Sequence, residues 1–126
     1  MVRKILLVMG LALGASLAMA DAAKPFIGTW SAKWQTEQQS YEASMVITTA
    51  GGTWQTYTRR RSNPCFGREV PRQHDVATDT ALEMTLKFSE VIPDCKDARV
   101  KLQVDASGQV TGRRGNAELT LKRESP

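Results

Sequence analysis

The stretch LEMTLKFS, from Leu82 to Ser89, decides the fold class, because apolar and polar residues alternate along its whole length. Successive side chains of a β-strand point to opposite faces, so this period of two predicts a strand. The even-numbered residues are expected in the interior and the odd-numbered residues in water. A strand with one buried and one wet face is typical of an antiparallel sheet.

The same alternation recurs on both sides of this stretch, and turn residues separate the segments that show it. Ala50-Gly51-Gly52 supplies two glycines that tolerate positive φ angles, and Asp105 and Gly108 mark another turn. No segment after the N-terminal region shows a helical stripe. The predicted strands are 26–34, 41–48, 53–58, 70–78 (an irregular one), 82–89, 98–104, 109–112 and 117–123.

These seven or eight short strands predict an all-β domain at 26–124, a small soluble antiparallel up-and-down β-barrel, with a β-sandwich as the alternative. Pairing of the first strand with the last would close the barrel and remove its exposed edges. A barrel of the outer-membrane type is excluded, because Lys87, Lys101 and Glu118 stand on faces that would meet lipid.

The N-terminus carries the features of a secretory signal peptide. Arg3 and Lys4 precede an apolar run, and Ala18-Met19-Ala20 has small residues where a signal peptidase reads. The run is too short for a spanning helix, which needs about 20 residues. We therefore predict a leader at 1–20 cleaved near Ala20, a lead-in at 21–25, and a mature bacterial protein that is periplasmic or secreted, without a transmembrane segment.

The charge balance of the chain bears on its partners. Of 17 basic side chains, the leader removes two, and the remaining 15 face 13 acidic ones, which leaves a net charge near +2. Nucleic-acid-binding domains carry a larger basic excess, so no nucleic-acid partner is expected. A mature chain of about 100 residues suits one domain, and we expect a monomer.

The two cysteines, Cys65 and Cys95, both lie in the part predicted to be exported. An oxidising compartment allows them to pair. Their spacing is far too long for a C-x-x-C redox motif, and a single histidine, His74, argues against a zinc site. We predict a structural disulfide and no metal or other cofactor.

A basic stretch surrounds the first cysteine, with Arg59, Arg60 and Arg61 before it and Arg68 and Arg72 after it. Two interpretations stay open. Acidic residues near Cys95 could neutralise a merely solvated loop. Alternatively, the loop is a contact surface for an anionic partner, such as a phosphate or carboxylate ligand, lipopolysaccharide, an acidic glycan or an acidic protein.

The segment Gly28-Thr29-Trp30 resembles the first strand of lipocalin-like and avidin-like barrels, which open with Gly-x-Trp on an inward-facing strand. This resemblance implies an eight-stranded up-and-down barrel, with or without a cavity. In lipocalins an arginine late in the chain packs across that tryptophan, so the resemblance implies a contact between Arg123 and Trp30. No biotin-binding residues are carried over.

The large apolar residues allow two interpretations of the barrel interior. They either fill it or line a cavity for a small apolar ligand. The residues concerned are Trp30, Trp34, Trp54, Met84 and Phe88.

No catalytic motif appears in the sequence. It contains no Gly-x-Ser-x-Gly motif, no glycine-rich phosphate loop and no metal-ligand cluster, and Asp75 beside His74 is no catalytic set. We therefore predict a non-enzymatic binding or interaction protein that uses the arginine-rich loop at 59–72. The alternatives are a carrier of a small apolar ligand and, on analogy of fold alone, an inhibitor of a secreted hydrolase such as lysozyme.

Overall fold

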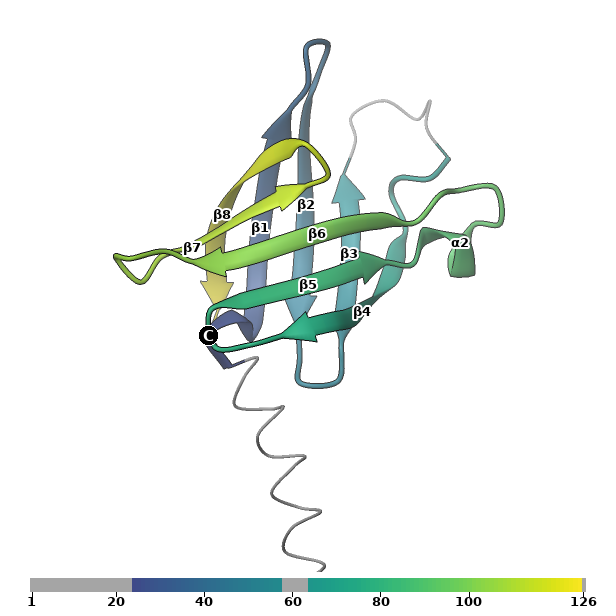
Figure 1. The fold of residues 1–126 in the computed structure, drawn as a ribbon. Coiled ribbons are helices and arrows are strands. Elements are labelled where there is room, and N and C mark those ends of the chain that lie inside the picture. The colour runs from purple at the N-terminus through teal and green to yellow at the C-terminus, as the bar shows by residue number, and fades with distance from the viewer. Residues whose placement is uncertain (1–23, 58–63, 126) are drawn as a thin grey trace, which may run out of the picture.

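The computed structural model describes residues 24–57 and 64–125, which form a closed antiparallel barrel of eight strands (Figure 1). Each strand pairs with its neighbours in the sequence, and the last strand pairs with the first. The predicted up-and-down barrel is thus confirmed and the sandwich is excluded. The elements are η1 (Lys24–Phe26), β1 (Gly28–Gln35), β2 (Ser40–Ile47), β3 (Gly52–Tyr57), β4 (Glu69–Ala77), β5 (Ala81–Leu86), α2 (Phe88–Val91), β6 (Ala98–Val104), β7 (Val110–Arg114) and β8 (Ala117–Ser125).

Two sequence predictions fall outside the described residues. They are the signal peptide at 1–20 and the arginine run Arg59, Arg60 and Arg61. Within residues 24–57 and 64–125, no helix has the length and apolar character needed to cross a membrane.

The strand boundaries follow the alternation of the sequence closely, but several strand ends differ. β7 and β8 extend two residues past their predicted ends, to Arg114 and Ser125. The first strand begins at Gly28, because Phe26 belongs to the short 3-10 helix η1. The stretch 82–89 leaves the sheet after Leu86, where Phe88 begins the helical turn α2. Phe88 is nevertheless buried, because α2 packs against β4 and turns this ring toward the core. The alternation of buried and exposed residues therefore continues to Phe88, although Phe88 is not in a strand.

Side chains fill the centre of the barrel. Trp54, Met45 and Leu82 have no exposed surface, so no space the size of a water molecule adjoins them. The five residues predicted to fill the interior or line a cavity all belong to this packed core, namely Trp30, Trp34, Trp54, Met84 and Phe88.

The turn between β2 and β3 depends on two glycines. Gly51 and Gly52 have φ angles of 146° and 125°, which residues other than glycine rarely adopt. A Cβ atom on Gly52 would also lie 1.9 Å from the carbonyl oxygen of Val46. This turn was predicted from its glycines, and the structure confirms it.

The barrel has two ends that differ in content. The β1–β2, β3–β4, β5–β6 and β7–β8 connections lie at one end, which carries the disulfide and is called the disulfide end below. The η1 helix and the other three turns lie at the opposite end, called the η1 end. In Figure 1 the β1–β2 turn points up, the β2–β3 turn points down, and β5 and β6 cross in front of β1–β3.

Candidate functional site

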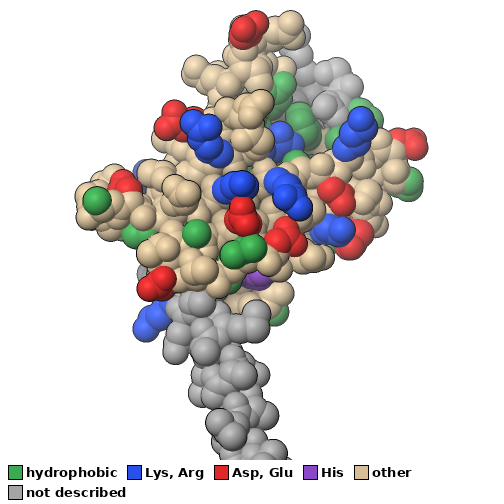
Figure 2. Space-filling model, in the orientation of Figure 1, with side chains coloured by type: hydrophobic (Ala, Val, Ile, Leu, Met, Phe, Trp, Pro, Cys, Tyr) green, Lys and Arg blue, Asp and Glu red, His purple; other side chains and the backbone are tan. Residues whose placement is uncertain are grey.

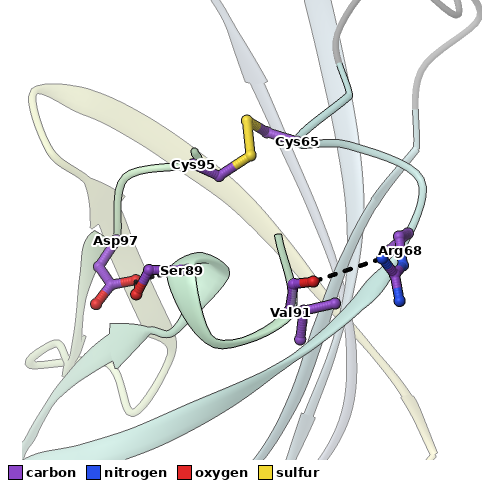
Figure 3. Close-up of a disulfide and its surroundings, with 6 residues drawn as sticks. All are labelled: Cys65, Arg68, Ser89, Val91, Cys95 and Asp97. Carbon is purple, nitrogen blue, oxygen red and sulfur yellow. Dashed lines mark hydrogen bonds between the residues drawn. A yellow bond between two sulfur atoms is a disulfide. The ribbon is translucent and has the colours of Figure 1, made fainter. Parts of the chain in front are cut away.

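The disulfide between Cys65 and Cys95 ties the β3–β4 loop to the β5–β6 connection (Figure 3). The two Cα atoms are 5.7 Å apart, and Cys95 is buried. Beside it, Arg68 Nη1 donates a hydrogen bond of 3.5 Å to the carbonyl oxygen of Val91. The predicted disulfide is confirmed, and hydrogen bonds of Gly67 and Arg68 also hold the described part of the loop.

Asp97, an acidic residue near Cys95, contacts other residues of the β5–β6 connection. Asp97 accepts hydrogen bonds from the backbone N–H of Ser89 (3.0 Å) and from its hydroxyl (2.8 Å), and its carboxylate lies 3.4 Å from Nζ of Lys87. The backbone bond from Ser89 is the main reason that the pKa of Asp97 is lowered. Asp97 thus fixes α2, and its partners are Ser89 and Lys87 rather than Arg68.

The arginines grouped by the sequence do not share one surface. Arg68 is exposed on the disulfide-tied loop, whereas Arg72 lies in β4 with only 3% of its surface exposed. The prediction that Arg72 contacts an anionic partner from an exposed loop is therefore wrong. The strand begins at Glu69, and its alternation turns Val70 and Arg72 into the barrel.

Four aromatic rings connect the core to the disulfide-tied loop. Trp54 lies 5.8 Å from Trp34, and Trp34 stacks on Tyr41 at 5.3 Å between ring centroids. Tyr41 then meets the ring of Phe66 edge-on at 5.8 Å. Because Phe66 follows Cys65 directly, the disulfide holds the outer end of this aromatic row. Offset or edge-to-face pairs of this kind add to the stability of a packed surface.

Arg114 joins these rings from β7. Its guanidinium carbon lies 5.2 Å from the Trp34 ring centroid and 6.0 Å from that of Phe88. The side chain is partly buried, and this burial lowers its pKa. Among the described residues, no hydrogen-bond partner faces its buried Nε atom. Arg114 is thus a partly desolvated cation that lies beside two aromatic rings.

Arg114 was not among the predicted site residues, although the alternation of inward and outward residues offered a signal. The alternation of β7 places Gly112 and Arg114 inward and Arg113 outward. An arginine at an inward position of a strand end is unusual, because charged side chains are seldom buried without a partner.

A groove of about 1240 Å³ lies beside the β1–β2 hairpin at the same end. Outward-facing residues of four adjacent strands form a row across it. Lys33 of β1 pairs with Thr120 of β8 and with Glu42 of β2, and Glu42 pairs with Tyr57 of β3. Trp34 and Tyr41 also border the groove, although their rings belong to the inner face. The outward residues of the groove are therefore mostly polar, and two rings of the aromatic row, Trp34 and Tyr41, border it.

The η1 end carries the other arginine contact. Arg123 lies across Trp30, with its guanidinium carbon 4.4 Å from the ring centroid. Its amino groups donate to the carbonyl oxygens of Pro25 (2.7 Å) and Ile27 (3.2 Å). The contact between Trp30 and Arg123 that the resemblance implies is present, and it fastens the chain entering β1 to β8.

The outer surface mixes charges of both signs. Lysine or arginine and aspartate or glutamate interleave on the face shown in Figure 2, and Lys101 pairs with Glu83 at 3.2 Å between β6 and β5. Within the described residues, no group of three or more His, Cys, Asp or Glu side chains is placed to hold a metal ion.

No family model, no curated protein and no solved structure matches this chain. The geometry of the barrel singles out the disulfide end, where a fixed loop, an aromatic row and a desolvated arginine meet.

Proposed function

We propose that this chain is a periplasmic or secreted, non-enzymatic binding protein that contacts its partner with the disulfide end of the barrel. The observation that carries this proposal is the combination of Arg114 with the row formed by Trp34, Tyr41 and Phe66. Aromatic and arginine side chains supply much of the energy at binding surfaces. Here the disulfide holds them in place before binding, which reduces the entropic cost of recognition.

The packing of the core favours this end over the barrel centre. Trp54 and Met45 are fully buried, so a ligand in the middle of the barrel would have to displace them. At the disulfide end, Tyr41, Phe66 and Arg114 are only partly buried. A partner can reach them without unpacking the core.

The surroundings of His74 support a non-enzymatic protein. Its ring contacts the guanidinium of Arg72 and the carbonyl oxygen of Thr48, and neither is a nucleophile. Burial and the charge of Arg72 lower its pKa and favour the neutral ring, which holds the carbonyl oxygen of Thr48 in the β2–β3 turn.

The proposed contact surface differs from the arginine-rich loop suggested by the sequence. Of the described arginines in that loop, only Arg68 is exposed, and Arg72 faces the interior. The loop contributes chiefly Phe66 and a fixed backbone, and the charge comes from Arg114 on another strand.

Chemical-shift mapping by NMR tests this proposal. The ¹⁵N-labelled protein is titrated separately with dextran sulfate, 2-naphthamide and lysozyme, which represent an anionic polymer, a small aromatic compound and a secreted hydrolase. We expect at least one titration to shift the amides of Tyr41, Phe66 and Arg114 together, and Phe66→Ala to weaken that binding about tenfold or more. Val76→Ala alters an exposed residue outside the site and should leave the affinity unchanged.

Shifts confined to the η1 end, or to the outward residues Lys33, Glu42 and Tyr57 of the groove, would contradict the proposal. So would binding that Phe66→Ala leaves as tight as in the wild type. A response to lysozyme alone would point to the inhibitor hypothesis within the same proposed surface.

A further inference from the structure

We infer that Arg114 is a carboxylate-binding residue, and that the ligand it takes is a small organic acid with a flat, apolar body. This inference rests on the proposed function and names the class of ligand for that surface. It follows from three observations: the unpaired charge of Arg114, the rings that frame it, and the charges of the competing sites.

Within residues 24–57 and 64–125, the charge of Arg114 has no acidic partner. Across the sheet it pairs in register with Val100 on one side and Ala117 on the other. Among the described residues it takes part in no ion pair, since Asp97 pairs with Lys87 and Glu83 with Lys101. A desolvated cation costs free energy unless an anion or other groups compensate it. A ligand carboxylate would supply that compensation directly.

The rings of Trp34 and Phe88 suit this role. Both lie near the guanidinium carbon, at 5.2 Å and 6.0 Å from their centroids, and hold the side chain by cation–π contact. A guanidinium fixed in this way offers its planar fork of N–H donors to the two oxygens of a carboxylate. A lysine ammonium would offer no such matched geometry.

The residues around Arg114 define the rest of the ligand. Tyr41, Phe66 and Ala117 are partly buried at this end, and Tyr41 and Ala117 pack against the core. They present apolar and aromatic surface next to one positive charge. A flat hydrophobic body joined to a carboxylate matches this combination, whereas a highly charged ligand would leave the rings unused.

Two other places among the described residues, the groove and the η1 end, are less suitable for an anion. Glu42 and Glu118 outnumber Lys33 along the groove, so its charge repels a carboxylate. At the η1 end, Arg72 as a whole is almost fully buried, so a ligand cannot reach its guanidinium. Arg114 is the described arginine that combines desolvation with partial access.

Isothermal titration calorimetry with 2-naphthoate and 2-naphthamide tests the inference, because the two compounds share one ring system and differ in charge. We expect 2-naphthoate to bind at least about tenfold tighter, as a charge-assisted hydrogen bond predicts. Arg114→Gln should abolish this difference and Arg114→Lys should keep only part of it. Arg113→Gln removes an exposed arginine one residue away and should preserve it.

The NMR signal of the Arg114 Nε–H group gives a second readout on the wild-type protein, independent of whether any variant folds. We expect 2-naphthoate, and not 2-naphthamide, to shift it. Equal binding of both compounds, with losses in Phe66→Ala, would overturn the carboxylate inference and leave the proposed surface intact. A preference for 2-naphthoate that survives in Arg114→Gln would also overturn it. Binding of neither compound would overturn the carboxylate inference, whereas dextran sulfate or lysozyme mapped to the same end would still support the proposed surface.

Discussion

The guanidinium of Arg72 lies 3.3 Å from Nε2 of His74 inside the η1 end of the barrel. The same Nε2 atom is 2.9 Å from the carbonyl oxygen of Thr48, so the neutral ring donates its proton there. Arg72 in turn donates to the carbonyl oxygen of Gly51. Two basic side chains from β4 therefore hold the β2–β3 turn through its backbone.

This pair makes the stability of the protein depend on pH near neutrality. Burial is the main cause that lowers the pKa of His74, and the charge of Arg72 acts in the same direction. The carbonyl oxygens of Thr48 and Gly51 and the charge of Asp75 oppose it less strongly. The pKa of a histidine in an unfolded chain is about 6.5. The contribution of His74 to stability is thus fully present above that pH. It falls as the pH drops below it, because the unfolded chain takes up the proton first.

Urea unfolding at pH 8, 6.5 and 5 measures this effect. We expect the free energy of unfolding to decrease between pH 8 and pH 5, and His74→Gln to flatten the decrease. An equal slope in wild type and variant would show that other groups cause the pH dependence.

Removal of the disulfide by the double change Cys65→Ser and Cys95→Ser should lower the free energy of unfolding by about 3.5 kcal/mol. The chain-entropy model gives this figure for a sequence separation of 30 residues. Guanidinium chloride unfolding of the variant, compared with the wild type with and without a reducing agent, provides the measurement. A loss below about 1 kcal/mol would mean that the contacts of Arg68 and Phe66 already restrain the loop.

Arg123→Ala should destabilise the barrel by about 1–2 kcal/mol. The variant loses a cation–π contact with Trp30 and two hydrogen bonds to carbonyl oxygens of the chain that enters β1. Lys122→Ala removes the neighbouring exposed charge and should change stability by less than about 0.5 kcal/mol. Thermal unfolding followed by circular dichroism compares the two, and equal losses would contradict the structural role of Arg123.

Gly52→Ala should cost more than about 2 kcal/mol, because it combines a positive φ angle with a collision against the carbonyl oxygen of Val46. Gly108→Ala is the matched control. Its φ angle is 86° and no atom lies within 4 Å of the added Cβ, so only backbone strain of about 1 kcal/mol is expected. Chemical denaturation of both variants separates the two causes, and a Gly52 variant no less stable than the Gly108 variant would contradict the collision.

Much of the fold followed from local patterns. The segment 98–104 was predicted as a strand and coincides with β6, and the inward positions Ala43, Met45 and Ile47 are buried as their alternation indicates. The glycine pair at the β2–β3 turn was equally readable. Phe88 shows the limit of such patterns, since its burial was predicted but its helical turn was not.

The candidate site was less predictable, because it depends on contacts between distant strands. Arg113 and Arg114 are adjacent in the sequence, and alternation can tell which of them points inward but not that the inward one meets Trp34. Arg72 was grouped with the arginines of the loop although it also fell within the predicted strand 70–78, and the structure shows that its side chain faces the interior. The alternation of an irregular strand was too weak to decide the face of Arg72, because a slip of one residue in register moves a side chain from water to the core.

By itself, the sequence determined that this chain forms short, mostly antiparallel strands of an all-β domain, because a period of two is a local property that each strand carries alone. It favoured a barrel over a sandwich, and the pairing of β1 with β8 decided the closure. It also determined which two cysteines could pair. Only the tertiary structure decided that Arg114 meets Trp34 and Phe88 at the disulfide end while Arg72 meets His74 at the other. The reason is that register and closure bring together residues of different strands, and the partners of a charged side chain then decide whether its charge is neutralised or available to a ligand.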